Sequence, residues 1–286
     1  MTYSSIAVAT DFSQASRPAL LRAARLAIPR GVEIRLLHVD DISAGAANGD
    51  ARAREITAEE RNAVDLLLGS AREELERAGA RVLEVRLAGV PHEAIVDAVR
   101  AGEADLLVCG THGRTGLRRL LMGSVAEICA RESAIPVLIA RGPAEHDFER
   151  VLVATDLDER GERAAKAACE LAAPGSIVDI VHFVPLLSLA SPAGRFYASM
   201  ELPRLQAEAW RRGNALIDRL GNSRVEPRFT VEIGDPRDGV LRRIDERHHD
   251  LVVVGSHGRG GLSRVAFGSV SEGIVRHAPC SVLVVR

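Results

Sequence analysis

Aromatic residues, net charge and long apolar runs are all scarce in this chain. Phe, Tyr and Trp make up 3% of its 286 residues, which leaves few rings on which nucleic-acid bases stack. The formal net charge is −2, so no overall basic field attracts nucleic acid or an anionic membrane. No apolar run reaches the roughly 18 residues that a membrane helix needs. We therefore expect neither nucleic acid nor a membrane as a partner.

Cysteines and targeting signals are equally sparse. Cys109, Cys129, Cys169 and Cys280 form no CxxC pair and no zinc quartet, which predicts free buried thiols in a reducing compartment. The N-terminal segment has no basic stretch before its short apolar run, so we expect no signal peptide and a cytoplasmic location.

Several catalytic motifs are absent. The sequence has no Walker GxxxxGK[ST], no GxGxxG after the first expected strand and no GxSxG elbow. Its spacing suggests no nucleophile–base pair, and the adjacent His248 and His249 have no partner at metal-site spacing, so a surface pair is expected there. We predict no catalytic residue and no metal ligand.

The chain contains two copies of one pattern. AVATDF, which contains Asp11, matches LVATDL, which contains Asp156, and the stretch around Gly110 matches that around Gly255, each 145 residues apart. A period this long indicates domain duplication rather than a solenoid. We expect domains at 1–142 and 148–286, with the polar segment 141–150 as the linker.

Strands and helices are expected to alternate within each copy. In copy one, strands at 6–10, 32–39, 81–88, 105–110 and 137–141 alternate with helices at 14–30, 56–79, 91–101 and 124–132. Continuous apolar strands suit a parallel sheet covered on both faces, and this alternation implies right-handed crossovers. The expected fold is α/β, with two tandem doubly wound domains that bind ligands at the carboxyl ends of their strands.

The pattern that indicates chemistry is Gly-x-x-Gly, nine residues, then Gly-Ser. It comprises Gly110, Gly113, Gly123 and Ser124 in copy one, and Gly255, Gly258, Gly268 and Ser269 in copy two. Each pattern begins where a strand ends and finishes where a helix starts, where free N–H groups and the helix dipole favour an anion. Arg114 and Arg259, with Arg119 and Arg264, add positive charge. We predict phosphate binding in at least one copy.

Capping offers an alternative explanation. Ser124 with Glu127, and Ser269 with Glu272, have capping-box spacing, which explains these serines without a ligand. It leaves the arginines and the repeated glycines unexplained, so we favour phosphate. His112 and His257 in the same loops either reach phosphate or lie exposed.

An aspartate closes the first strand of each copy. If the fourth strand lies beside the first, Asp11 and Asp156 face the same cleft as the glycine loops and can accept hydrogen bonds from ribose or base. The alternative is helix capping, a role for which Ser13 and Asp158 compete.

These residues resemble the universal stress protein family. The loop GTHGRTGLRRLLMGS, its counterpart GSHGRGGLSRVAFGS and the tail RHAPCSVLVVR are similar to the family's signature, and the likeness covers nearly the whole chain. It implies a tandem two-domain member whose five-stranded parallel sheets have the strand order 3-2-1-4-5. It also implies that domains pair through their fifth strands, within one chain or in a homodimer.

The resemblance further implies ATP as cofactor, with or without Mg²⁺, held by the glycine loop, the following serine, the first-strand aspartate and main-chain groups at the end of the second strand. The implied positions are Ala9, Asp11, Val39, Cys109, Gly110, Gly113, Gly123, Ser124 and Val125 in copy one, and Ala154, Asp156, Phe183, Val254, Gly255, Gly258, Gly268, Ser269 and Val270 in copy two.

The second copy departs from the first at the expected base pocket. HVDD at 38–41 corresponds to HFVP at 182–185, which the apolar stretch 186–200 follows. We expect this stretch to be a mostly buried connection; the alternative is that it covers a pocket or meets a partner. Phe183 is bulkier than Val39, and Pro185 lacks a backbone donor, so the first pocket is the stronger prediction. We expect an adenine-nucleotide-binding stress protein without rapid turnover. The alternatives are a slow ATPase or phosphoryl or nucleotidyl transferase, and a dimerising module that binds no nucleotide.

Overall fold

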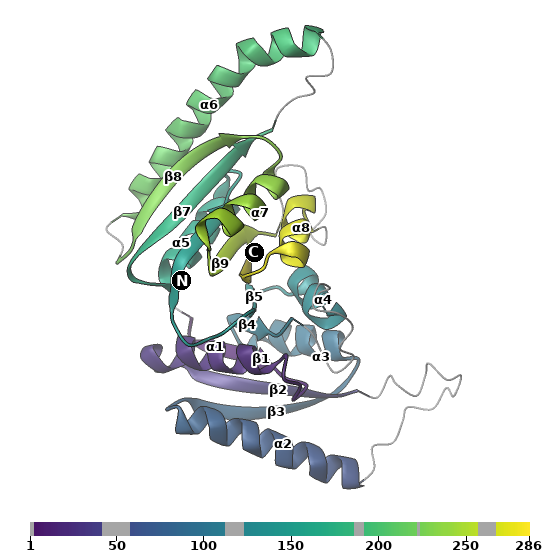
Figure 1. Ribbon diagram of the computed structural model, residues 1–286. Helices are drawn as coiled ribbons and strands as arrows, with labels where there is room; N and C mark the ends of the chain where they lie inside the picture. Colours follow the sequence, from purple (N-terminus) through teal and green to yellow (C-terminus); the bar gives the residue numbers. More distant parts are fainter. Residues whose placement is uncertain (1–2, 42–57, 112–122, 186–191, 222–223, 257–266) are drawn as a thin grey trace, which may run out of the picture. The chain divides into compact units, whose positions relative to one another are not determined.

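A computed structural model describes residues 3–41, 58–111, 123–185, 192–221, 224–256 and 267–286. The chain divides into two compact units, Thr2–Glu145 and His146–Arg286, each built on its own strands and helices. Figure 1 labels most of these elements along the chain. None of the described helices combines the length and the apolar composition that a membrane span requires.

The first unit alternates strands and helices throughout. Its elements are β1 Ser5–Ala9, α1 Arg17–Ala27, the 3₁₀ turn η1 Ile28–Arg30, β2 Glu33–Asp41, α2 Ala58–Arg77, β3 Arg81–Gly89, α3 Pro91–Ala98, the π turn η3 Val99–Glu103, β4 Leu106–Cys109, α4 Ser124–Glu132 and β5 Val137–Ile139. All of its strand pairs are parallel, in the order β3-β2-β1-β4-β5. The strand order reverses beside β1, because β2 lies on one side of it and β4 on the other.

The second unit repeats this arrangement. It consists of β6 Phe148–Ala154, α5 Glu159–Leu171, β7 Ala172–Val184, α6 Pro192–Leu220, β8 Glu226–Ile233, α7 Pro236–Arg247, β9 Leu251–Gly255, α8 Ser269–His277 and β10 Ser281–Val285. Its strands are again all parallel, in the order β8-β7-β6-β9-β10. The prediction of two doubly wound α/β domains is confirmed, and each unit has the strand order that the resemblance implied.

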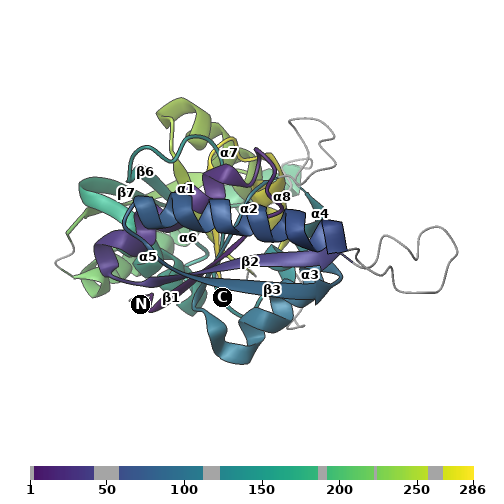
Figure 2. The same cartoon turned by 90° about the horizontal axis from the view of Figure 1, so that it is seen from below.

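The helices pack against both faces of each sheet. In the first unit α1 and α2 contact each other, as do α3 and α4, and in the second unit α5 contacts α6 and α7 contacts α8. Figure 2 shows α2 running along β2 and β3. The packing buries whole strands: β4, β5 and β10 are buried at every position. This explains why they are continuously apolar in sequence.

Corresponding positions on the first two helices form an ion pair in both units, but the acidic and the basic residue are exchanged. Arg17 on α1 pairs with Glu74 on α2 at 2.8 Å, whereas Glu162 on α5 pairs with Arg219 on α6 at 2.8 Å. The two pairs stand 145 residues apart in sequence. The contact has therefore been retained while both of its residues have changed.

The structure corrects two predicted connections. The predicted linker 141–150 contains the start of β6, where Phe148 is buried, and the carbonyl oxygens of Pro143 and Ala144 accept hydrogen bonds from Arg22 and Arg25 of α1. The predicted connection 186–200 is wrong from Pro192 onward, because α6 begins there with proline in its first turn. Residues 186–191 lie outside the described part of the chain.

The prediction of a surface pair at His248 and His249 is confirmed for His248 and wrong for His249. His248 is exposed in a left-handed conformation at the end of α7, but His249 is only 6% exposed. Its two ring nitrogens lie 3.2 Å from the Arg243 carbonyl oxygen and 3.1 Å from Asp179 Oδ2. A buried carboxylate on β7 supplies the partner that the sequence pattern did not reveal. The four cysteines are free and buried, as predicted.

Candidate functional site

In each unit, the helix that follows the fourth strand has glycine as its N-cap residue. Gly123 is the N-cap of α4 and Gly268 that of α8, with extended backbone angles of φ −65°, ψ 141° and φ −67°, ψ 140°. The predicted capping boxes are wrong, because Ser124 and Ser269 are the first helical residues and their side chains are exposed. Among the described residues, neither helix start receives a side-chain hydrogen bond from its cap. Each therefore presents N–H groups and a positive dipole end to its surroundings.

Each of these helix starts is tied to the end of its strand. The Gly123 N–H donates to the Thr111 carbonyl oxygen at 2.6 Å, and the Gly268 N–H donates to that of Ser256 at 3.0 Å. The same bond thus closes the loop in both units. The remaining predicted loop residues, Gly113, Arg114, Gly258 and Arg259, and the loop histidines His112 and His257, lie outside the described residues.

Gly110 brings the first-strand loop beside the glycine loop. A Cβ at this position would lie 2.7 Å from the Ala15 carbonyl oxygen and 3.0 Å from Ser16 Cα. The backbone before α1 therefore passes directly against the end of β4. This close approach requires glycine here whether or not a ligand binds, and it places the segment that follows Asp11 beside the residue that ends β4.

Asp11 organises its own turn and does not cap α1. Its Oδ1 accepts hydrogen bonds from the Ser13 N–H at 3.1 Å and from the Ser13 hydroxyl at 2.7 Å. The N-cap of α1 is Ser16. Helix capping, the alternative explanation of Asp11, is therefore wrong. Ser13, which competed with Asp11 for that role, makes the capping-type contact, since its hydroxyl accepts from the Ser16 N–H at 3.3 Å.

Asp156 is flanked by a second carboxylate. Asp158, not Asp156, caps α5, since its side chain accepts from the Gly161 N–H at 2.8 Å. Burial, then the adjacent Asp158 carboxylate, raises the pKa of Asp156 to about 6. Burial alone would raise the pKa of Asp158, but the hydrogen bond from the Gly161 N–H and then the interaction with Asp156 lower the pKa of Asp158. At mildly acidic pH the two carboxylates thus hold one proton between them.

A histidine holds each aspartate loop from the neighbouring strand. His38 Nδ1 lies 2.9 Å from the Thr10 carbonyl oxygen, and His182 Nδ1 lies 2.8 Å from that of Thr155. The residue after each aspartate has a positive φ, 61° at Phe12 and 62° at Leu157. Such angles are uncommon outside glycine and often accompany functional sites. Sequence reasoning missed these histidines, although their repetition in HVDD and HFVP was visible.

The remaining predicted site residues stand at the carboxyl ends of the strands or at the helix starts. Ala9 and Ala154 end β1 and β6, Val39 and Phe183 lie near the ends of β2 and β7, Cys109 ends β4, Val254 and Gly255 end β9, and Val125 and Val270 are in the first turns of α4 and α8. The Cys109 thiol is turned into the core, where a hydrogen bond with Cys129 and burial raise the pKa of Cys109 well above its ordinary range. The Cys109 carbonyl oxygen accepts from the Ala140 N–H at 2.8 Å.

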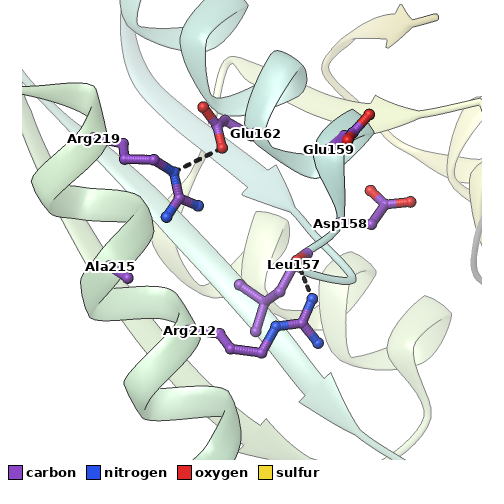
Figure 3. A pocket seen from close by; sticks show the side chains of 7 residues that line it. All are labelled: Leu157, Asp158, Glu159, Glu162, Arg212, Ala215 and Arg219. Carbon is purple, nitrogen blue, oxygen red and sulfur yellow. Dashed lines mark hydrogen bonds and ion pairs between the residues drawn. The ribbon is translucent and has the colours of Figure 1, made fainter.

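A pocket of about 440 Å³ lies next to the Asp156 loop, between the start of α5 and α6 (Figure 3). It is lined by Leu157, Asp158, Glu159, Glu162, Arg212, Ala215 and Arg219. Arg212 donates to the Leu157 carbonyl oxygen and Arg219 to Glu162. Because both arginines already bind protein acceptors, we assign these contacts to holding the Asp156 loop against α6 rather than to phosphate.

Comparison with known proteins gives the same assignment for both halves. The model of the universal stress protein family matches residues 2–141 and again residues 147–286. Universal stress protein E of Photorhabdus laumondii is 26% identical over 305 residues, covering 99% of this chain and 95% of that protein. Universal stress protein MJ0577 of Methanocaldococcus jannaschii is 29% identical over 158 residues, covering 49% of this chain and 95% of that protein.

A solved structure shares the fold across the whole chain. The crystal structure of a universal stress protein from Archaeoglobus fulgidus superposes with a TM-score of 0.70 at 22% identity, covering 100% of this chain and 99% of the other. At this identity the likeness bears on the fold alone.

Proposed function

The chain belongs to the universal stress protein family, and on that basis we propose that it binds ATP at the carboxyl end of each of its sheets. One observation carries the proposal: in both units the helix after the fourth strand has an N-cap glycine, and that fourth strand pairs with the first strand, which leads into the aspartate. A helix start whose N–H groups lack a side-chain cap is suited to phosphate.

The phosphates would lie against the glycine-started helices. The N–H groups of the first turns of α4 and α8 and the hydroxyls of Ser124 and Ser269 are donors, as phosphate oxygens require. Both hydroxyls are exposed, so a ligand can reach them without rearrangement of the core. Gly113, Arg114, Gly258 and Arg259 would complete this side through the backbone and the guanidinium groups.

The nucleoside would lie toward the first and second strands. Asp11 and Asp156 can accept hydrogen bonds from ribose hydroxyls, and the main chain at Ala9, Val39, Cys109, Ala154, Phe183 and Val254 would face the sugar and base. Corresponding threonines hold the turn around the aspartate in the two units. The N–H groups of Phe12 and Leu157 donate to the hydroxyls of Thr10 and Thr155, respectively. Such a turn supports an acceptor of fixed position.

We also propose that the nucleotide is held without rapid turnover. Main-chain N–H groups and a serine hydroxyl neutralise phosphate charge in the ground state, and contacts of this kind bind a nucleotide without activating water. Binding of ATP with its Mg²⁺ would shift each loop toward its ligand-bound conformation. A regulatory signal can consist of such a change.

Calorimetric titration of the full chain with ATP, ADP and adenosine tests the proposal. We expect affinity to fall as phosphates are removed, and the loss of one site in each of the single variants Asp11→Ala and Asp156→Ala. Arg228→Gln, which alters an exposed ion pair on β8, is the matched control and should bind like the wild type. Absence of heat with all three ligands would refute nucleotide binding.

The same samples separate binding from hydrolysis. After titration, the bound nucleotide is released by denaturation and its phosphate content is measured by chromatography. Persisting ATP supports a binding protein. Steady conversion to ADP that is lost in Asp11→Ala or Asp156→Ala would instead favour the slow ATPase.

A further inference from the structure

The position two residues after the site aspartate differs between the units. Ser13 stands there in the first unit and Asp158 in the second. The Ser13 hydroxyl donates to Asp11 Oδ1 at 2.7 Å, and serine brings no second carboxylate to this turn. Asp158 has no donor in its side chain when ionised: its backbone N–H lies 3.4 Å from Asp156 Oδ1, and its carboxylate interacts with that of Asp156.

The second carboxylate is fixed in place. Asp158 accepts from the Gly161 N–H at 2.8 Å as the N-cap of α5, so it cannot turn away without uncapping the helix. Asp156 Oδ2 is buried and has no hydrogen-bond partner among the described residues. A buried carboxylate oxygen without a donor favours the protonated form of the acid.

The cations described near this turn do not stabilise the ionised form of Asp156 by direct contact. On α5, Arg160 interacts with Asp158. On α6, Arg212 is engaged by the Leu157 carbonyl oxygen, as Figure 3 shows, and on β7 His182 is directed at the Thr155 carbonyl oxygen. The described cations around the turn thus contact Asp158 or main-chain oxygens rather than Asp156.

We propose that Asp158 makes ligand binding at the second site depend on pH, whereas Ser13 leaves the first site without this dependence. The two carboxylates hold one proton at mildly acidic pH, and protonated Asp156 loses acceptor capacity toward ribose hydroxyls. As the pH rises the proton leaves and Asp156 becomes an acceptor on both oxygens. The second site therefore fills preferentially at neutral pH, and the occupancy of the two sites diverges on acidification. This inference rests on the proposed function.

The raised pKa of Asp156, about 6, sets the size of the effect. A group that titrates there is about one-tenth ionised at pH 5 and almost fully ionised at pH 7.5, which corresponds to about a tenfold change in affinity. ATP itself titrates in this range, but its titration affects both sites alike. The ratio of the affinities of the two sites therefore isolates the contribution of the protein.

The experiment uses two single-site forms of the full chain. Asp11→Ala leaves the second site, Asp156→Ala leaves the first, and ATP affinity is measured from pH 5 to pH 7.5. We expect affinity at the second site to rise about tenfold more than affinity at the first. Adding Asp158→Ser to the first form should remove the excess, because serine also caps helices, and adding Ser13→Asp to the second should create it. Equal pH slopes at both sites, or a slope that survives Asp158→Ser, would overturn the inference.

A readout without nucleotide keeps this inference separate from the proposed function. Carbon NMR of aspartate-labelled protein follows the carboxyl titration directly, with Asp156→Ala used for assignment. We expect an Asp156 midpoint near pH 6 that moves to lower pH in Asp158→Ser. If no ATP binds at any pH but this titration is seen, the proposed function fails and the shared proton stands. If Asp158→Ser does not move the titration midpoint of Asp156, the two carboxylates do not share a proton.

Discussion

The ring of Phe183 on β7 lies where a side chain on Gly239 of α7 would stand. A Cβ at position 239 would be 2.1 Å from Phe183 Cε1 and 2.5 Å from its Cζ. Phe183 is only 5% exposed. The corresponding residues of the first unit are Val39 and Ala94. The larger ring is thus accommodated by a smaller residue opposite it, whereas narrowing of the second base pocket by Phe183 stays a prediction.

This pairing predicts that Gly239→Ala destabilises the second unit. Alanine normally favours a helix interior over glycine, but here its methyl group collides with a buried ring, and overpacking of this kind costs about 1–3 kcal/mol. Thermal unfolding should show the loss. The double variant Phe183→Val with Gly239→Ala recreates the pair of the first unit and should recover stability, giving a coupling of about 1–3 kcal/mol in the double-mutant cycle. Additive effects would contradict the account.

Gly110 gives a prediction about the first site. In Gly110→Ala the new methyl group meets the Ala15 carbonyl oxygen and Ser16 Cα, which are backbone atoms and cannot rotate away. We expect a loss of about 1–3 kcal/mol in stability together with weaker ATP binding at the first site. Gly69→Ala on α2 is the control, because no atom lies within 4 Å of its added Cβ, and it should stabilise by about 0.5–1 kcal/mol. A harmless Gly110→Ala would show that the backbone before α1 does not pack against Gly110.

Asp179 predicts an acid-labile contribution to stability. The His249 hydrogen bond, and then Arg243 and Arg247, lower the pKa of Asp179 against the effect of burial. Because the folded state holds the ionised form, this stabilisation is present above the unfolded pKa near 3.9 and is lost as the pH falls through the lower folded value.

Denaturant unfolding of Asp179→Asn at two pH values checks this. At pH 7 the variant should lose about 1–3 kcal/mol, because its buried partners keep unsatisfied donors. Below pH 4 the difference from the wild type should shrink. Glu226→Gln, at an exposed ion pair on β8, should match the wild type under both conditions. A difference that grows on acidification would contradict the assigned sign.

The fold was predictable because it depends on regular apolar patterns. Buried strands such as β9 and β10 are apolar along their length, and Gly31, with φ 62°, ends the first helical segment as expected. The helix start at Ser124 was likewise predicted to the residue. These features are local, so a single sequence contains them.

What was missed depends on contacts between distant residues. His249 is buried because Asp179, 70 positions away, supplies its partner, and Gly239 is required because Phe183 packs on it. The capping boxes were misassigned because serine and glycine are both acceptable at an N-cap, and backbone angles decided in favour of Gly123 and Gly268. Loop residues such as Gly113 and Arg114 stay predictions.

ATP binding by the paired variant Gly123→Asp with Gly268→Asp tests the central claim most directly, with the matching asparagine pair as control. Both residues suit the extended N-cap backbone and cap helices slightly better than glycine, so neither variant should lose stability. Calorimetry should show at least about a tenfold loss of ATP affinity with aspartate, because its carboxylate takes the place of phosphate and repels it. Asparagine should retain most of the affinity. Unchanged ATP binding by the aspartate pair would show that phosphate does not lie at these helix starts.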